Sequence, residues 1–503
     1  MMKVLRPVLL LAVLLYLSHT LQGQHSFELF IDTEEDCILS EACTNGSRNI
    51  ILVGGIGPSD TDDYDALVVK VYPDGEFISR RFDLMDTLSV FSTVDILDNG
   101  NYFITGSYST EAQYLLRDHL WVIILNQDLN LISYKSYLVK KPYVGYGTSC
   151  CSVVDNEGNV VLTTLVVNED TEQKTAFTDF GFYKFNQLGD TLLSCYYSYI
   201  FDEIPFELTK MPNSNNLMLI ERATMYNNHA EFMQLDPDLN IISINQLWTL
   251  DITLYGNLSS DYWVSDTEFL VSGNRHMDTS KADIECIGVY RVDTSANYLQ
   301  ELLLDKPDTT DYVAWRNSMA YANDTTIYIG GFQNYLGFWL PDPTIVELYV
   351  IDKNMNLLGY KELGGDACYE VWGIIATHDD GCLVYGTKYL STEYERDVQI
   401  WKVLRDDINI ITEVTENNIL VKDILVYPNP TTDHVFIQLG HSLTWQELSL
   451  SIYNINGKKV FQKRMDQPGN LLEVDISNLK PDYYILSIDN KKHNIYTRKI
   501  LKQ

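Results

Sequence analysis

Short apolar segments separated by polar turns follow one another along the first four hundred residues of the chain. The recurring unit is an apolar strand, a turn rich in Asp and Asn, and a second apolar strand, as in Asn126–Ser133 and Asp236–Ser243. Strand-length apolar runs bounded by such turns are typical of β-hairpins. The turn recurs every 50 to 60 residues and begins at Tyr72, Asn126, Asn186, Asp236, Asp293, Asp352 and Arg405.

A second series of turns lies between the members of the first. Asn-Gly and Asp-Gly pairs supply the positive φ angles that tight hairpins need. Apolar strands that end in glycine follow several of them, as in Ile51–Gly54 and Leu383–Gly386. Each repeat therefore contains two hairpins, or four strands. The turns of this series are Asn45-Gly46, Asn99-Gly100, Glu157-Gly158, Ser214-Asn215, Asp266-Thr267, Asp324-Thr325 and Asp380-Gly381.

Seven such repeats predict an all-β protein in which residues 25–412 form a β-propeller of seven four-stranded blades. A single blade cannot bury both of its faces, whereas blades stacked around a ring can. The apolar segment Phe27–Ile31 precedes the first repeat, and we expect it to complete the last blade and close the ring. A β-solenoid is the alternative, although its repeats are usually shorter.

Both ends of the chain have features that the repeats lack. Lys3 and Arg6 precede an apolar run, so residues 1–23 have the layout of a secretory signal peptide. No other stretch reaches 18 apolar residues, so we expect no transmembrane segment in the mature chain. Residues 413–422 have the composition of a polar linker. Residues 423–503 alternate between short strands and turns, a pattern that predicts a small immunoglobulin-like β-sandwich.

Several short motifs follow one another in this last segment, namely Tyr427-Pro428-Asn429-Pro430, then Asn456-Gly457, then a basic tail with Lys499 and Lys502. In this order they resemble the type A C-terminal sorting domain of the type IX secretion system of Bacteroidetes. The resemblance implies Sec export to the periplasm, passage through the type IX outer-membrane translocon and removal of the domain by a surface sortase. The expected location is therefore the cell surface or the medium. A generic small β-sandwich is the alternative.

Acidic residues are concentrated in the repeats. The chain has 69 Asp and Glu against 36 Lys and Arg, a formal charge of -33. Residues 422–502 carry a net charge of +3, which leaves -36 on residues 1–421. Such a charge repels nucleic acid and anionic membranes, so we expect no nucleic-acid partner. Solubility is the plain explanation, and binding of a cation or of a basic partner is the alternative.

The two kinds of connection lie on opposite faces of the predicted ring. Short turns occupy one face, and the longer connections occupy the other, where binding residues tend to lie. We therefore expect an extracellular glycan or protein ligand to contact aromatic rings on the long-loop face. Loops folded over their own blades are the plainer explanation. The candidate rings are Tyr335, Phe338, Trp339, Tyr143, Tyr146 and Trp315.

The first long connection contains a cluster of carboxylates. Asp60, Asp62, Asp63 and Asp65 offer the hard oxygen ligands that calcium prefers, so they form a candidate metal site. Their spacing differs from that of a helix–loop–helix calcium site. A solvated acidic loop is the plainer explanation, and we expect no other cofactor.

Local catalytic motifs are absent from the sequence. It contains no H-E-x-x-H, no G-x-S-x-G and no phosphate-binding G-x-x-x-x-G-K-[ST] pattern. Chance pairs of carboxylates are too numerous to indicate glycoside cleavage. We therefore favour a non-enzymatic binding module over an enzyme. The alternatives are an extracellular polymer-degrading enzyme, either a hydrolase or a lyase, and a structural surface protein.

Overall fold

The computed structural model describes most of the chain that follows the predicted signal peptide. The described residues form strands and one short 3-10 helix, η1 (Arg405–Asp407). They divide into two compact units, and the boundary falls after Ile410. Among them, no helix has the length and apolar character needed to cross a membrane. The described ranges are 25–33, 35–45, 48–58, 64–83, 88–109, 119–138, 150–168, 177–197, 203–223, 229–247, 254–276, 285–304, 309–334, 343–390, 395–410, 425–438, 448–454, 458–465, 471–490 and 494–503.

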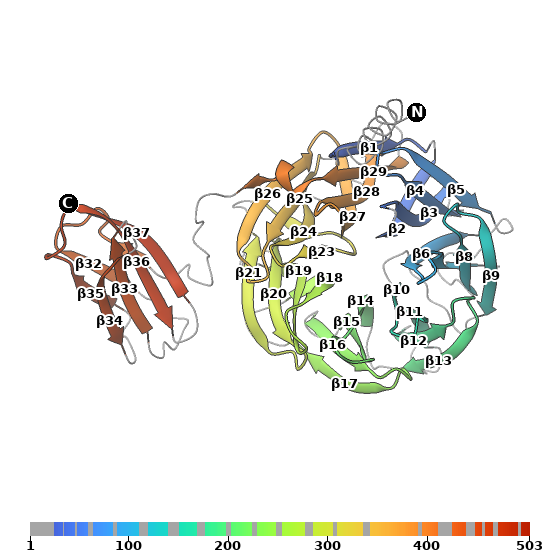
Figure 1. Ribbon diagram of the computed structural model, residues 1–503, viewed down its shortest axis with the longest axis horizontal. Helices are drawn as coiled ribbons and strands as arrows, with labels where there is room; N and C mark the ends of the chain where they lie inside the picture. The colour runs from blue at the N-terminus through green and yellow to red at the C-terminus, as the bar shows by residue number, and fades with distance from the viewer. Residues whose placement is uncertain are drawn as a thin grey trace, which may run out of the picture. The chain divides into compact units, whose positions relative to one another are not determined.

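The described part of the first unit is a ring of seven antiparallel sheets, which confirms the predicted propeller (Figure 1). In the first five blades the strands follow chain order from the axis outward. The first blade consists of β2 (Asp36–Thr44), β3 (Ile50–Gly57), β4 (Asp65–Val71) and β5 (Phe77–Phe82), and the second of β6 (Ser89–Ile96), β7 (Tyr102–Tyr108), β8 (His119–Leu125) and β9 (Leu131–Leu138). The third consists of β10 (Cys150–Val154), β11 (Val160–Asn168), β12 (Phe177–Phe185) and β13 (Thr191–Tyr197), and the fourth of β14 (Glu203–Lys210), β15 (Leu217–Ala223), β16 (His229–Leu235) and β17 (Ile241–Gln246). The fifth consists of β18 (Leu254–Trp263), β19 (Glu268–His276), β20 (Glu285–Asp293) and β21 (Tyr298–Leu304).

The last two blades depart from this plan. In the sixth, the innermost strand is broken into β22 (Asp311–Val313) and β23 (Met319–Asn323), and the short strand β30 (Asn409–Ile410) is added at the outer edge. The seventh takes its outermost strand from the beginning of the chain. The remaining strands are β24 (Thr326–Gln333), β25 (Ile345–Ile351) and β26 (Leu357–Gly364) in the sixth blade, and β27 (Cys368–Ala376), β28 (Cys382–Leu390), β29 (Glu395–Val403) and β1 (Phe27–Ile31) in the seventh.

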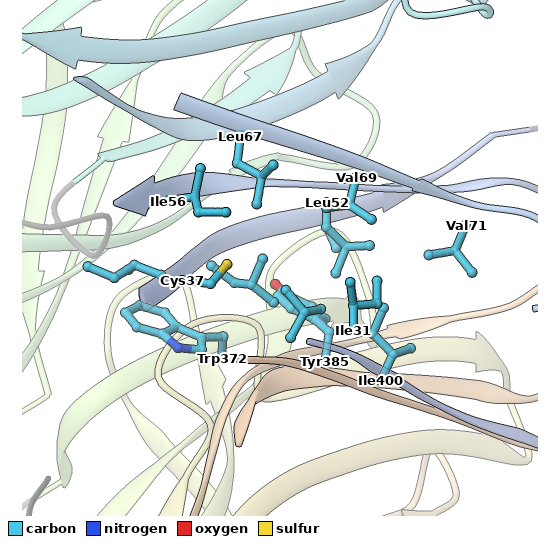
Figure 2. Close-up of a cluster of buried hydrophobic side chains, with 14 of the residues drawn as sticks. Ile31, Cys37, Leu52, Ile56, Leu67, Val69, Val71, Trp372, Tyr385 and Ile400 are labelled. Carbon is cyan, nitrogen blue, oxygen red and sulfur yellow. The ribbon is translucent and has the colours of Figure 1, made fainter. Parts of the chain in front are cut away.

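The first strand closes the ring, as predicted. β1 pairs antiparallel with β29, from Phe27 opposite Lys402 to Ile31 opposite Val398. Ile31 thereby enters a buried cluster shared by the first and seventh blades, where it lies beside Tyr385 (Figure 2). The seam between these two blades therefore depends on a strand from the far end of the chain.

A buried ion pair lies at the same seam. Arg396 of β29 donates from Nε to Asp36 Oδ1 at 2.9 Å, and its Nη2 donates to the same carboxylate. The backbone N–H of Arg396 also donates to Asp36 Oδ1, at 2.8 Å, and the Tyr64 hydroxyl donates to Oδ2 at 2.5 Å. Asp36 is 4% exposed, so protein groups rather than water satisfy its charge.

Side-chain caps explain the Asp and Asn residues that begin the first series of turns. Asp236 Oδ1 accepts hydrogen bonds from the backbone N–H groups of Asp238 at 2.9 Å and Asn240 at 2.8 Å. The tight turn that results places Leu239 at a φ of 64° and buries its side chain in the sheet. Corresponding pairs of hydrogen bonds form at Asn126, Asn186, Asp293 and Asp352.

Two of the glycines that end apolar strands allow the innermost strand to bend. A Cβ atom on Gly54 would lie 1.9 Å from the carbonyl oxygen of Ile38, and one on Gly386 would lie 1.9 Å from that of Glu370. The register between β2 and β3, and between β27 and β28, shifts near these points. Glycine is therefore required where a bulge brings the two backbones together.

The second unit is a sandwich of two antiparallel sheets, in agreement with the predicted fold of the C-terminal domain. Facing apolar side chains from both sheets form its core, including Val435, Ile437, Leu450, Leu486 and Ile500. The smaller sheet consists of β31 (Leu425–Tyr427), β32 (His434–Gln438) and β35 (Leu471–Asp475), and the larger, in spatial order, of β34 (Lys459–Met465), β33 (Leu448–Asn454), β36 (Asp482–Asn490) and β37 (Asn494–Lys502).

The Tyr-Pro-Asn-Pro motif and the basic tail are in direct contact. The Asn429 side chain donates to the carbonyl oxygen of Lys499 at 2.9 Å and accepts from the backbone N–H of Leu501 at 2.9 Å. Lys502 is buried, and its Nζ lies 3.6 Å from Asp433 Oδ1. Two motifs that are about seventy residues apart in sequence thus hold the last strand in place together.

Candidate active site

Most of the side chains predicted to bind a ligand lie outside the described residues, so their roles stay predictions. The predicted signal peptide, residues 1–23, and the predicted linker, residues 413–422, lie outside them as well. The side chains concerned are Tyr143, Tyr146, Tyr335, Phe338 and Trp339, the candidate calcium ligands Asp60, Asp62 and Asp63, and Asn456 and Gly457 of the sorting motif.

Trp315 and Asp65 are described, and both have protein partners. Trp315 is half-buried, and its ring centroid lies 5.7 Å from that of Phe332. Asp65 forms an ion pair with Arg81, and Arg81 forms a second ion pair with Glu35. Within the described ranges, no group of three or more His, Cys, Asp or Glu side chains is arranged to hold a metal ion. Ligand contact by Trp315 and calcium binding by Asp65 therefore stay predictions.

Carboxyl groups that the sequence analysis did not single out gather around the ring axis. The innermost strands β2, β6, β14 and β18 face this axis (Figure 1), and they carry Glu41, Asp95, Glu207 and Asp261 respectively. Electrostatic interactions connect Glu41 with Asp95 and Glu207, and connect Glu207 with Asp261. We call these four residues the axial carboxyl cluster.

Backbone bulges direct two members of the axial carboxyl cluster. The register shifts immediately before Glu41, where β2 pairs with β3, and immediately before Glu207, where β14 pairs with β15. A bulge breaks the regular alternation of a strand and turns the following side chain to a new direction. Both glutamates thereby become available to the axis.

Arg316 approaches the axis from the break in the sixth blade. The segment between β22 and β23 leaves its own sheet and bonds to the neighbouring blade. The backbone N–H of Trp315 donates to Val371 O at 3.0 Å, and that of Arg316 donates to Trp372 O at 2.8 Å. These bonds fix the backbone from which the guanidinium extends.

The guanidinium of Arg316 binds groups from the first three blades. Its Nη1 donates to Ser92 O at 2.9 Å, its Nη2 donates to Cys150 O, and Nη1 lies 3.8 Å from Glu41 Oε2. The residue is 5% exposed. Arg316 therefore links the sixth blade to the opposite side of the ring and supplies one buried positive charge beside the carboxyl cluster.

Glu41 and Asp95 titrate in the neutral range. Burial raises the pKa of Glu41 to about 7, against the opposing influence of the Arg316 charge. The backbone N–H of Val94 donates to Glu41 Oε2 at 3.1 Å. Burial also raises the pKa of Asp95 to about 6, although the Ser152 hydroxyl donates to its Oδ2 at 2.5 Å. Desolvation thus outweighs the hydrogen bonds that favour the charged forms.

Glu207 and Asp261 form a pair with different affinities for protons. Burial, followed by the negative charges of Asp261 and Glu41, raises the pKa of Glu207 well above its usual value. Desolvation by the surrounding protein atoms raises the pKa of Asp261 to about 6, and the backbone N–H of Tyr321 donates to its Oδ2 at 2.8 Å. The Asp261 side chain remains accessible to solvent. The surroundings of Glu207 therefore favour its protonated form, whereas Asp261 ionises near pH 6.

A protonated carboxyl beside an ionised one provides a general acid and a general base in one site. In such an arrangement the ionised group can accept a proton and the protonated group can donate one to a leaving oxygen. The positive charge of Arg316 also reduces the electrostatic repulsion that the four carboxyls would exert on an anionic ligand.

Asp95 makes the stability of the ring depend on pH. Its raised pKa means that the folded protein holds this proton more tightly than the unfolded chain. The resulting stabilisation is present below the usual pKa of aspartate and is lost as pH rises through about 6. We expect Asp95→Asn to raise stability relative to the natural protein by about 1–3 kcal/mol at pH 7.5, and much less at pH 4.

Urea unfolding at both pH values measures this difference. Asp98→Asn is the matched control, because it removes the same charge from an exposed position in the turn that follows β6. A stability difference for Asp95→Asn that does not change between the two pH values would contradict the assignment.

The sequence gives little indication of this site. The five residues come from five blades, and they meet because the ring closes and because bulges redirect individual side chains. Arg316 is the nearest to a detectable feature, since it immediately follows Trp315, which was singled out for its ring. The four carboxyls are among 69 acidic residues and share no motif.

Comparison with known proteins identifies the second unit. The family described as the secretion system C-terminal sorting domain matches residues 425–503. This confirms the resemblance seen in the sequence. The protein is therefore exported across the outer membrane by the type IX secretion system, to the cell surface or the medium.

One curated relative is an enzyme. The endo-acting ulvan lyase of Formosa agariphila (strain DSM 15362 / KCTC 12365 / LMG 23005 / KMM 3901 / M-2Alg 35-1) is 25% identical over 114 residues. The match covers 22% of this chain and 20% of the relative, so it spans about a fifth of that protein's length. This finding overturns the expectation of a non-enzymatic binding module. The axial carboxyls come from separate blades, so a search for local sequence motifs does not detect them.

Solved structures with a similar fold come from different kinds of protein. An ulvan lyase of family PL25 bound to -[GlcA(1-4)Rha3S]- is 10% identical, with a TM-score of 0.49, and the match covers 77% of this chain and 98% of that one. A fungal alcohol oxidase of the AA5 family in complex with copper is 9% identical, with a TM-score of 0.47, covering 95% and 99%. At these identities the likeness concerns the fold alone.

Proposed function

We propose that the protein is a secreted polysaccharide lyase whose reaction takes place at the axial carboxyl cluster. The observation that carries the proposal is the pair Glu207 and Asp261, two electrostatically coupled carboxyls at the axis whose pKa values are both raised, that of Glu207 by burial and by the charge of Asp261. The local similarity to an endo-acting ulvan lyase supports the choice of reaction class. Export to the cell exterior places the enzyme where polymeric substrates occur.

The proposed reaction is an elimination at a uronate residue. Asp261, ionised, removes the proton from the carbon next to the uronate carboxylate. The electron pair released forms a carbon–carbon double bond, and the bond to the glycosidic oxygen breaks. Glu207 donates its proton to that oxygen as it leaves. The products are a new chain end with a hydroxyl group and an unsaturated uronate, without addition of water.

Arg316 assists the reaction by its charge. Removal of the proton is difficult while the neighbouring carboxylate is fully negative, and a guanidinium close to the axis stabilises negative charge that develops on the substrate. Arg316 itself is held by two backbone carbonyls and by Glu41, so its position does not depend on substrate. We therefore assign it an electrostatic role and no proton transfer.

The test is an assay of the purified mature chain with three polymers. The first polymer is ulvan, the second is a polysaccharide without charge, and the third is a uronate polymer without sulfate. Each is incubated separately with the protein. Expected products from an anionic substrate absorb ultraviolet light, because the new double bond is conjugated with the carboxylate. An increase in reducing ends without this absorbance would show that the protein is a hydrolase and would contradict the lyase reaction. Binding of a polymer without any cleavage would contradict an enzymatic role.

Salt provides a second readout of the same assay. The protein carries a formal charge of -33, so it repels a polyanion at long range. Moderate salt screens this repulsion, since the Debye length falls to about 8 Å at physiological ionic strength. We expect KM for ulvan to fall when salt is raised from low to physiological concentration, and KM for an uncharged polymer to stay constant.

A further inference from the structure

The larger sheet of the sorting domain has one face in the core and one face without a partner within the described residues. Side chains of Leu450, Ile452, Leu486 and Ile500 enter the core. Because side chains alternate along a strand, their sequence neighbours lie on the outer face. This outer face belongs to the part of the chain that directs export, so it is a candidate for recognition.

One row of residues crosses all four strands on this face. The strand registers place Lys459 of β34 opposite Tyr453 of β33, Tyr453 opposite Ile485 of β36, and Ile485 opposite Lys499 of β37. Tyr483 lies two residues from Ile485 on the same face. We call these five residues the cross-strand row.

The cross-strand row combines exposed apolar groups with ammonium groups. Tyr483 is 45% exposed and Ile485 is 43% exposed. Lys499 Nζ lies 4.0 Å from the centroid of the Tyr483 ring, and Lys459 Nζ lies 5.5 Å from that of Tyr453. An apolar centre with a polar rim is the usual organisation of a protein–protein contact. Aromatic side chains are also the most frequent anchors in such contacts.

The sorting motif controls the geometry of this row. Asn429 of the Tyr-Pro-Asn-Pro turn binds the backbone of Lys499 and of Leu501, and it therefore fixes the end of β37. The side chain of Lys499 is thus presented on the outer face while its backbone is held from the other sheet. The Tyr-Pro-Asn-Pro motif can therefore be required for recognition through the position of Lys499, without contacting the receptor itself.

We propose that the cross-strand row is the surface by which the sorting domain docks onto a protein of the secretion apparatus. The partner presents an apolar or aromatic centre between carboxylates, because lysines stand at both ends of the row. The inference concerns export, and it is independent of the proposed lyase activity.

Charge reversal within the full-length chain tests the proposal. The double variant Lys459→Glu and Lys499→Glu is expressed in a bacterium with an active type IX apparatus, and the exported fraction is measured. The matched control is Lys463→Glu with Arg498→Glu, on the same two strands. Lys463 and Arg498 are exposed on the two edge strands, opposite Leu450 and Leu486 and outside the cross-strand row. We expect export to fall at least tenfold for the first pair and less than twofold for the control.

Two further measurements separate recognition from folding. The variant Lys459→Arg with Lys499→Arg keeps the charge and is expected to restore export. A photoreactive residue at position 485 of the otherwise natural chain is expected to cross-link to an outer-membrane component whose deletion abolishes export. Equal losses in the reversed pair and its control would overturn the proposal. So would cross-linking at position 485 to the propeller of the same chain alone.

Discussion

Replacing Arg396 with alanine is expected to destabilise the propeller by about 3–5 kcal/mol. Arg396 joins the seventh blade to Asp36 of the first blade, and both side chains are largely shielded from solvent. Removal of the guanidinium leaves a buried carboxylate with the Tyr64 hydroxyl as its remaining side-chain donor at the seam. An unpaired buried charge costs far more than the pair contributed, because the carboxylate loses its counter-ion without regaining water.

Arg81→Ala is the control for this prediction. Arg81 also pairs with two carboxylates of the first blade, Glu35 and Asp65, but its side chain is 43% exposed. Water and salt replace such a pair easily, so the expected cost is about 0–1 kcal/mol. Urea unfolding followed by tryptophan fluorescence measures both variants. If the two arginines cost the same, the seam does not depend on the buried pair.

Replacing Glu207 with glutamine is expected to lower kcat for the proposed lyase reaction by about 10²–10⁴-fold, the usual contribution of a positioned acid or base. Glutamine keeps the size of the side chain and loses the proton that the leaving oxygen needs. Asp261→Asn is expected to have an effect of the same order, because asparagine cannot accept the proton of the substrate. Circular dichroism and thermal unfolding verify that both variants retain the ring.

The pH profile distinguishes the two roles. Activity of the natural protein should rise through about pH 6 as Asp261 ionises, and fall at higher pH as Glu207 loses its proton. Asp238→Asn, which removes an exposed charge from an outer turn, should leave the profile unchanged. If Asp261→Asn retains full activity and the acidic limb near pH 6, the base must be sought elsewhere.

The ring could be predicted from the sequence because its determinants are local. Asp236 and the residues equivalent to it bind backbone N–H groups within their own turns, so each turn leaves a recognisable sequence. Gly54 and Gly386 are required by close backbone contacts, so they also recur. The closing role of Phe27–Ile31 was predictable for a related reason, since an extra apolar strand needs an edge to pair with.

The axial cluster was not predictable because its determinants are distant and individual. Glu41 and Glu207 depend on bulges, and bulges leave no reliable mark in a single sequence. Arg316 acts across the ring on carbonyl groups of Ser92 and Cys150, which any residue type provides. The sequence pattern therefore specified the scaffold, while irregularities of single blades placed the reactive groups.

The sorting domain shows an intermediate case. Its motifs were visible because their residue types are restricted, but the reason for the restriction was not. Asn429 must offer a donor and an acceptor at once, which only an amide side chain of this length does at that turn. Lys502 was singled out as part of the basic tail, and the structure shows it buried beside Asp433.

Closure of the ring by β1 also bears on the fate of incomplete molecules. The partner of β1 is β29, which ends at Val403, and the export domain follows it in the chain. A product truncated within the seventh blade before β29 therefore lacks both the partner strand of β1 and the sorting domain that directs export. In such a product β1 has no partner strand, and the first blade lacks part of the neighbour against which it packs.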